Sequence, residues 1–306
     1  TALFQCDWSS NFDRNGLDDL TWTMNFGTGA NIDEQFRRLQ QMRPNAPLMC
    51  SEFWSGWFDK WGARHETRPA ADMVAGIDEM LQKGISFSLY MTHGGTSFGH
   101  WAGANSPGFA PDVTSYDYDA PINEYGQPTE KYWLLRKTLQ KYADGKLPDV
   151  PKPAAVLTTF PEVKLDFVAP IECGSDSMAE SRQPLTFEEM DMGYGSMIYN
   201  TSLPAIEGGS MLHIEGHDFV QVFINRRYIG TIDRVKNERS LLLPAIRKGD
   251  VLTMLVEGMG RINFGRAIKD FKGIVGDVTL TADVDGNEVT WNLKDWRMRR
   301  IADDYA

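Results

Sequence analysis

The chain has 306 residues, 42% of them hydrophobic and 24% charged, which is enough for about two domains with a sizeable core. The net charge of −11 argues against nucleic acid or an anionic membrane as a partner. No apolar run approaches the ~18 residues of a membrane span. The three cysteines, Cys6, Cys50 and Cys173, are too few and too far apart to indicate a disulfide scaffold or a zinc site.

Residues 1–145 alternate apolar strand patterns with amphipathic helix patterns. The predicted strands are 1–6, 20–26, 47–50 and 85–91, and the predicted helices are 31–42, 69–83 and 129–142. This alternation predicts a parallel sheet with helices, and four such units are too few to close an eight-stranded barrel. Because residues 1–6 already show a buried-strand pattern, we expect further polypeptide before Thr1.

The composition changes at a Pro-rich linker, placed at residues 146–160. In residues 161–306 the helical periodicity is largely lost, and short alternating strands separated by turn residues take over. These predicted strands are 195–203, 210–215, 219–224, 228–232, 240–243, 251–256 and 278–282. The pattern predicts an all-β sandwich or jelly-roll domain.

One stretch, residues 47–62 (PLMCSEFWSGWFDKWG), carries the strongest chemical signal. It places Glu52 at the end of a short apolar strand, with Phe53, Trp54 and Trp57 close behind. Chemistry in parallel α/β barrels collects at the C-terminal ends of the strands. A carboxylate among aromatic rings is typical of sugar-cleaving sites. The spacing alone fits equally well a Glu that caps the next helix, beside ordinary core tryptophans.

Three motifs occur in order along the first region: SEFWSGWFDKWG, SLYMTHGGTSFGHWAGAN and TSYDYDAPINEYG. Together with LVEGMGRINFG in the second region, they resemble the retaining β-galactosidases of glycoside hydrolase family 35 over essentially the whole chain. The resemblance implies a (β/α)8 TIM barrel followed by β-sandwich domains. It also implies hydrolysis of terminal non-reducing β-D-galactose through a covalent galactosyl-enzyme. On this basis we expect the C-terminal half of the barrel and a jelly-roll-like domain, without the first half of the barrel and the C-terminal end.

The resemblance assigns a role to six residues. Glu52 matches the catalytic nucleophile. Substrate contacts are implied for five aromatic residues: Trp54, Trp57, Tyr90, Tyr116 and Tyr118. From the residues alone, Tyr90 could simply pack, and the segment 116–119 could be a turn rich in Asx hydrogen bonds. We favour tyrosine hydroxyls that bond the sugar, with Asp117 and Asp119 holding the loop.

The second carboxylate of a retaining glycosidase is expected outside this sequence. In the family, the acid/base Glu lies in an Asn-Glu pair after an earlier strand, which places it before Thr1. The pair Asn123-Glu124 has the same letters, but it precedes a helix rather than ending a strand, and we interpret Glu124 as a solvated loop residue. We therefore expect little or no turnover from the isolated chain.

Other features predict no cofactor and no metal. His93 has no second His or Cys at metal-ligand spacing, and residues 94–97 lack the Lys of a phosphate-binding loop. The partners expected are a galactoside and the remainder of the polypeptide; a homo-oligomer stays open. A periplasmic or secreted location is favoured over the cytoplasm because the family is often exported. A non-catalytic galactoside-binding protein is the alternative function.

Overall fold

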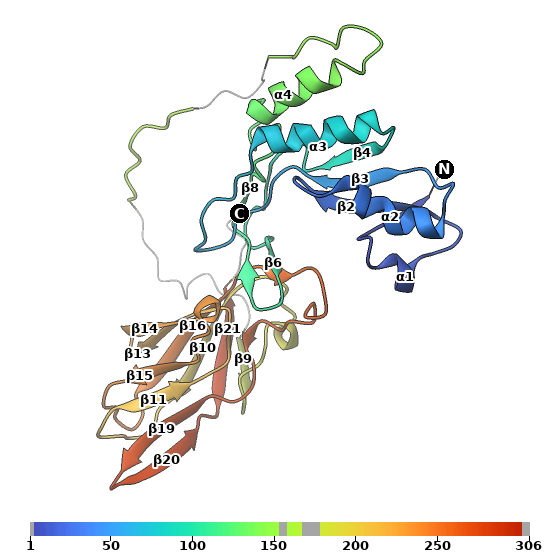
Figure 1. Ribbon diagram of the computed structural model, residues 1–306. Helices are drawn as coiled ribbons and strands as arrows, with labels where there is room; N and C mark the ends of the chain where they lie inside the picture. The colour runs from blue at the N-terminus through green and yellow to red at the C-terminus, as the bar shows by residue number, and fades with distance from the viewer. Residues whose placement is uncertain (1–2, 153–157, 167–177, 302–306) are drawn as a thin grey trace. The chain divides into compact units, whose positions relative to one another are not determined.

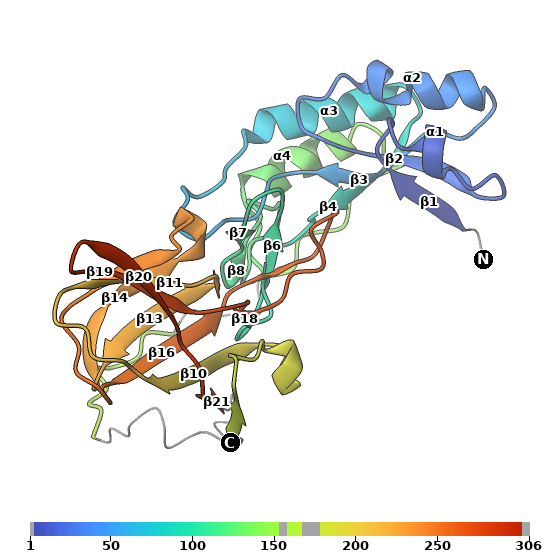
Figure 2. The same ribbon diagram turned by 90° about the horizontal axis from the view of Figure 1, so that it is seen from below.

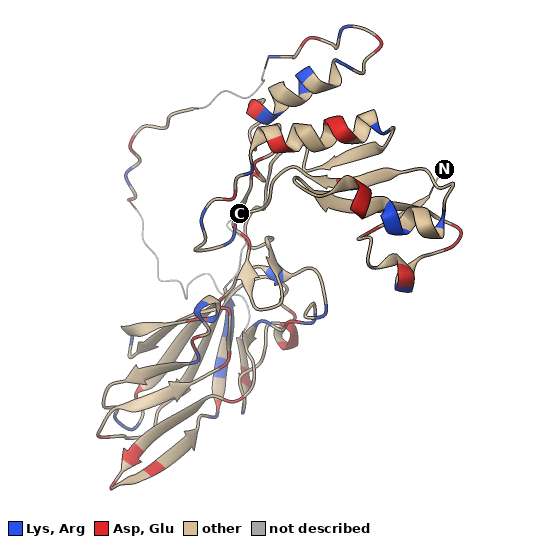
Figure 3. Ribbon diagram, in the orientation of Figure 1, with Lys and Arg blue, Asp and Glu red and all other residues tan. Residues whose placement is uncertain are grey.

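The computed structural model describes residues 3–152, 158–166 and 178–301. It consists of two compact units, each described here by itself (Figure 1). The first comprises residues 1–97 and 113–160, and the second comprises residues 98–112 and 161–306. The segment 98–112, which the sequence places with residues 1–145, thus groups with the second unit. Figure 3 shows acidic and basic residues interspersed over the elements of both units.

The first unit contains a four-stranded parallel sheet in the order β1-β2-β3-β4. Its strands are β1 (Phe4–Asp7), β2 (Thr21–Gly27), β3 (Met49–Trp54) and β4 (Ser86–Tyr90). The helices are α1 (Phe12–Asn15), α2 (Ile32–Met42), α3 (Ala70–Gln82) and α4 (Glu130–Leu139). The α/β character predicted for this part of the chain is confirmed; the one-turn helix α1 was not predicted.

Local sequence signals explain where the helices begin and end. The Asn31 side chain accepts a hydrogen bond from the backbone N–H of Glu34 at 3.1 Å, which caps α2 as predicted. Behind this cap, Ile32, Phe36 and Leu39 are buried on one face. Past the end of α3, Gly84 adopts a φ of +69°, a conformation that disfavours a side chain.

The two faces of the parallel sheet differ in character. Helices α2 and α3 lie along one side of it (Figure 2), where Met24, Phe26 and Cys50 join the helical core. On the opposite face, the Thr23 hydroxyl lies 2.6 Å from the Ser51 hydroxyl, and Ser51 donates to Asn25 at 3.1 Å. One face of this sheet is therefore apolar, and the other carries a hydrogen-bonded polar layer.

The second unit is all-β, as predicted. An antiparallel sheet of six strands has the order β14-β13-β16-β10-β21-β9, and a second sheet of four has the order β15-β11-β19-β20. The first contains β14 (Arg227–Asp233), β13 (Phe219–Ile224), β16 (Val251–Gly258), β10 (Gly195–Ser202), β21 (Trp296–Ile301) and β9 (Met178–Ser181). The second contains β15 (Ser240–Leu243), β11 (Ser210–His213), β19 (Thr279–Val284) and β20 (Asn287–Asn292). Residues from both sheets share one buried core.

All seven strands predicted for this region are observed, with ends that agree within two residues. The strands β9, β20 and β21 were not predicted. Shorter elements complete the unit: β6 (Gly103–Asn105), β7 (Ala110–Pro111), β12 (Gly216–His217), β17 (Arg261–Ile262), β18 (Gly273–Ile274), η2 (Glu188–Met190) and η3 (Arg234–Lys236). In the first unit, β5 (Gly95–Thr96) pairs with β8 (Ser115–Tyr116). Cys173 lies outside the described residues.

Candidate active site

A bulge in β3 determines where Glu52 points. The register to β2 pairs Met24 with Cys50 and Asn25 with Glu52, so β3 contains one extra residue at Ser51. The register to β4 shifts over the same stretch, between Cys50 and Phe53. In a regular strand, Glu52 would share the face of Cys50, which is buried against the helices. The extra residue gives that core position to Phe53 instead and leaves Glu52 only partly buried.

The sequence placed the end of this strand at Cys50, and that boundary is wrong. The strand continues through Glu52 to Trp54, and the next helix begins only at Ala70. Glu52 therefore does not cap a following helix, which removes the structural alternative considered for it. Its carboxylate instead accepts a hydrogen bond from the indole N–H of Trp54, with Nε1 to Oε2 at 2.9 Å.

The five aromatic residues of the predicted site form one continuous cluster. The rings of Trp54 and Trp57 are in edge contact at 5.6 Å, and Trp57 lies 6.1 Å from Tyr118. Tyr118 stacks on Tyr116 at 5.6 Å and meets the edge of Tyr90 at 5.5 Å. The two hydroxyls of Tyr90 and Tyr116 lie 3.3 Å apart. The structure thus brings together side chains that are up to 64 residues apart in the sequence.

Phe58 belongs to this cluster, although the sequence did not single it out. It stacks on Trp57 at 4.9 Å and on Tyr116 at 5.5 Å, so it joins the tryptophan part of the cluster to the tyrosine part. The only sequence feature that could have indicated Phe58 was its position directly after Trp57. Burial of Tyr118, which is only 2% exposed, raises the pKa of its hydroxyl. That hydroxyl is therefore a neutral hydrogen-bonding group at ordinary pH.

The loop that carries Tyr116 and Tyr118 is held by a buried ammonium group. Lys131, in the first turn of α4, donates to the Asp119 carboxylate at 2.5 Å, to the Asp119 carbonyl at 2.8 Å and to the Ser55 carbonyl at 2.7 Å. The Asp119 carboxylate also accepts from the backbone N–H of Arg68 at 2.7 Å. Burial lowers the pKa of Lys131, and the ion pair with Asp119 opposes that shift. Lys131 thus ties the tyrosine loop to the segment that follows β3.

Two further features fix the same loop. Asp117 accepts a hydrogen bond from the backbone N–H of Asp119 at 3.2 Å, so the expected loop-holding role of both aspartates is confirmed. Gly56 approaches the loop so closely that a Cβ atom there would lie 1.7 Å from the carbonyl oxygen of Tyr118. Only glycine allows this approach without a shift of the backbone.

Glu124 is not the solvated residue that the sequence suggested. It is partly buried, and its carboxylate accepts hydrogen bonds from the hydroxyls of Thr96 and, at 2.6 Å, Ser115. Because Thr96 and Ser115 belong to the paired strands β5 and β8, Glu124 holds these two strands together. This structural role explains the residue without a part in catalysis.

An open cavity of about 620 Å³ lies beside the cluster. Of the six predicted site residues, Trp54 and Trp57 line it, together with Asn25 and Gly27 of β2, Trp8 after β1, and Arg68. The cavity therefore faces the C-terminal ends of the first three strands, where ligands bind in parallel α/β proteins. Glu52 and the three tyrosines are not among its lining residues.

The described residues contain neither a metal-binding cluster nor a membrane-spanning helix. Within those ranges, no group of three or more His, Cys, Asp or Glu side chains could hold a metal ion. None of the described helices has the length and apolarity needed to cross a bilayer.

Comparison with known proteins adds a family to this geometry. The model for glycosyl hydrolases family 35 matches residues 1–142, and the model for the beta-galactosidase first all-beta domain matches residues 184–301. A Homo sapiens protein named beta-galactosidase is 36% identical over 290 residues, which is 92% of this chain and 41% of that protein. The Bos taurus beta-galactosidase is 37% identical over 280 residues, covering 88% and 42%. The Mus musculus beta-galactosidase-1-like protein is 34% identical over 287 residues, covering 89% and 43%. The chain thus spans less than half the length of these relatives.

Proposed function

Because the chain belongs to glycosyl hydrolases family 35, we propose that it carries the nucleophile, Glu52, of a retaining β-galactosidase. The observation that supports this most directly is the bulge, since it turns a carboxylate away from the apolar core at the C-terminal end of a parallel strand. The Trp54 indole N–H then holds that carboxylate in place at 2.9 Å.

The proposed architecture is the C-terminal half of a (β/α)8 barrel, followed after a linker at 146–160 by a jelly-roll-like domain. The four strands are parallel and adjacent in chain order, and α2 and α3 cover a single face. A doubly wound sheet would carry helices on both faces, whereas a barrel keeps its helices outside. The polar layer on the opposite face would then line the barrel interior, with further strands pairing with β1 and β4.

The proposed reaction proceeds in two displacements. The Glu52 carboxylate attacks the anomeric carbon of a terminal β-galactose and forms a covalent galactosyl-enzyme, which water then hydrolyses with net retention. The aromatic cluster would supply faces for the sugar ring, and the hydroxyls of Tyr90 and Tyr116 would bond its hydroxyl groups. Tyrosine hydroxyls suit this purpose, because each can both donate and accept hydrogen bonds.

A second carboxylate must protonate the departing alcohol from about 5–5.5 Å away from the nucleophile. Glu124 is committed to Thr96 and Ser115, so we assign this role to a residue outside the 306-residue sequence. The relatives have room for it, since the matched region covers about two fifths of the human protein. The isolated chain should consequently show negligible turnover.

The test uses a polypeptide that includes these residues and the remainder of the barrel. When the hydrolysis of an aryl β-galactoside is monitored by NMR, the first sugar released should be β-galactose, which demonstrates retention of the anomeric configuration. Glu52→Gln should reduce kcat by at least about 10³-fold, as expected for removal of a nucleophile. The matched substitution Glu124→Gln should reduce kcat by less than about 10-fold. Galactoside binding without turnover in the unaltered protein would instead support the non-catalytic alternative.

A further inference from the structure

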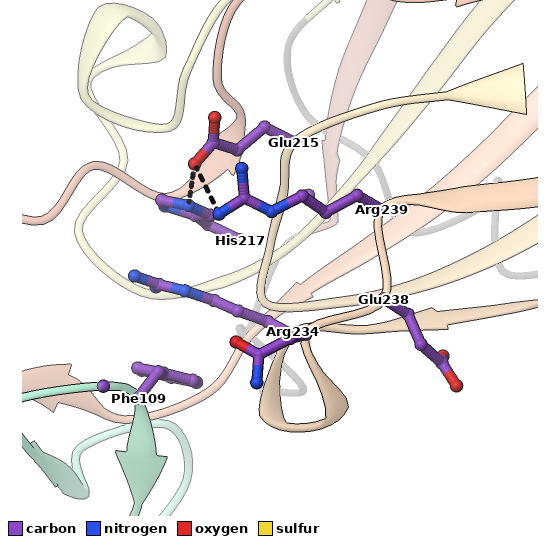
Figure 4. A pocket seen from close by; sticks show the side chains of 9 residues that line it. Phe109, Glu215, His217, Arg234, Glu238 and Arg239 are labelled. Carbon is purple, nitrogen blue, oxygen red and sulfur yellow. Dashed lines mark ion pairs between the residues drawn. The ribbon is translucent and has the colours of Figure 1, made fainter.

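A small cavity in the all-β unit lies outside the candidate active site. Its volume is about 220 Å³, and its lining includes Phe109, Glu215, His217, Arg234 and Arg239. Figure 4 shows Glu215, His217 and Arg239 gathered on one side, with Arg234 and Phe109 along another. Phe109 comes from a distant part of the sequence, and the fold places it beside the segment 215–239 in one depression.

The inner wall of this cavity is electrically balanced. Arg234 donates to Asp218 at 2.7 Å and to the two oxygens of Asp270 at 2.7 and 3.0 Å. Lys272, which is fully buried, lies 2.7 Å from Asp218 and 3.1 Å from Asp270. Two cations thus neutralise two anions. The Arg234 guanidinium also lies 4.2 Å from the centre of the Phe109 ring, so this wall offers flat surfaces rather than a free charge.

The rim, in contrast, holds Glu215 in two longer pairings, drawn as dashed lines in Figure 4. The Glu215 carboxylate lies 3.5 Å from Nε2 of His217 and 3.8 Å from Nη2 of Arg239. Both separations are too long for good hydrogen bonds. Nδ1 of His217 donates to the Phe271 carbonyl at 2.6 Å, which orients the ring and leaves Nε2 toward Glu215. An intervening hydroxyl group could bond to each of these three side chains.

We propose that this cavity binds one neutral sugar ring, independently of the site around Glu52. An anion would meet the carboxylate of Glu215, and a cation would meet the guanidinium of Arg239. A polyhydroxylated ring can donate to Glu215 and accept from Arg239 at the same time, and it can lie against the flat inner wall. The volume is below the ~300–1,000 Å³ of drug-sized pockets, which suits a single monosaccharide.

The probe is methyl β-D-galactoside, titrated by calorimetry into the 306-residue chain carrying Trp57→Ala, which weakens the site near Glu52. We expect saturable binding that Glu215→Gln and Arg239→Ala each weaken about 10-fold. The matched control Arg227→Ala changes an exposed arginine at the start of β14 and should leave the affinity unchanged. The Arg239 side chain is 71% exposed, so its removal should not affect folding, which the thermal midpoint checks.

Three results would overturn the proposal. These are no sugar binding in the Trp57→Ala chain, equal affinity in the Glu215→Gln and Arg227→Ala chains, and displacement of the sugar by inorganic phosphate at equal concentration. Each bears on this cavity alone. The proposed reaction at Glu52 would stand in every case, since it is measured by turnover.

Discussion

Replacing Lys131 with methionine should release the tyrosine loop. The substitution keeps an apolar stem of similar length and removes the ammonium that donates to Asp119 and Ser55. Removing one partner of a buried ion pair costs about 3–5 kcal/mol. The Asp119 side chain is 26% exposed and still accepts the hydrogen bond from the Arg68 backbone N–H. Because solvent and this bond continue to stabilise the carboxylate, the loss should fall at the lower end of that range. We therefore expect the free energy of unfolding to fall by about 3 kcal/mol.

The matched control is Lys137→Met, on the exposed face of the same helix, which should cost less than about 0.5 kcal/mol. Urea unfolding followed by tryptophan fluorescence measures both variants. Hydrogen–deuterium exchange should show faster exchange over residues 115–120 in the Lys131→Met chain only. If the two variants unfold at the same urea concentration and exchange alike, Lys131 does not anchor the loop.

Three further changes test separate parts of the account. Gly56→Ala should lower the free energy of unfolding by about 1–3 kcal/mol, because its Cβ would overlap the Tyr118 carbonyl; an unchanged urea midpoint would contradict the close approach. Trp54→Phe removes the indole N–H that donates to the Glu52 carboxylate, and it should slow the covalent labelling of Glu52 by a 2-deoxy-2-fluoro-galactoside about 10-fold. An unchanged labelling rate would show that this hydrogen bond does not position the carboxylate. Burial alone would raise the pKa of the Asp270 carboxyl, but Arg234 and Lys272 hold this pKa below its ordinary value of 3.8. The ionised Asp270 therefore stabilises the folded chain above about pH 4, and this stabilisation is lost as the pH falls through the lowered pKa. Asp270→Asn should therefore be less stable at pH 7 and lose less stability than the parent between about pH 5 and 3; parallel pH profiles would refute this.

The helices could be predicted because their signals are local. Asn31 caps α2 through a neighbouring N–H, and apolar residues at helical spacing mark its buried face. Most strands of the all-β unit were equally readable, because alternation and turn residues lie within a few positions. The site residues were found through motifs, and the structure gathers them into one cluster.

The missed features depend on contacts between distant residues. The bulge at Ser51 cannot be read from the β3 sequence, since it exists only in the register with β2 and β4. The anchoring role of Lys131 was hidden because lysine on a helix is normally solvated. Its spacing from Leu135 and Thr138, both buried on the same face, was the one available hint.

The central claim is that the Glu52 carboxylate attacks an anomeric carbon. A 2-deoxy-2-fluoro-galactoside with a good leaving group needs no acid to react and should trap the covalent intermediate in a polypeptide with the complete barrel. Peptide mapping by mass spectrometry should then locate one 2-deoxy-2-fluoro-galactosyl group on Glu52, and Glu52→Gln should abolish this label. A label on another carboxylate, with Glu52 unmodified, would contradict the account.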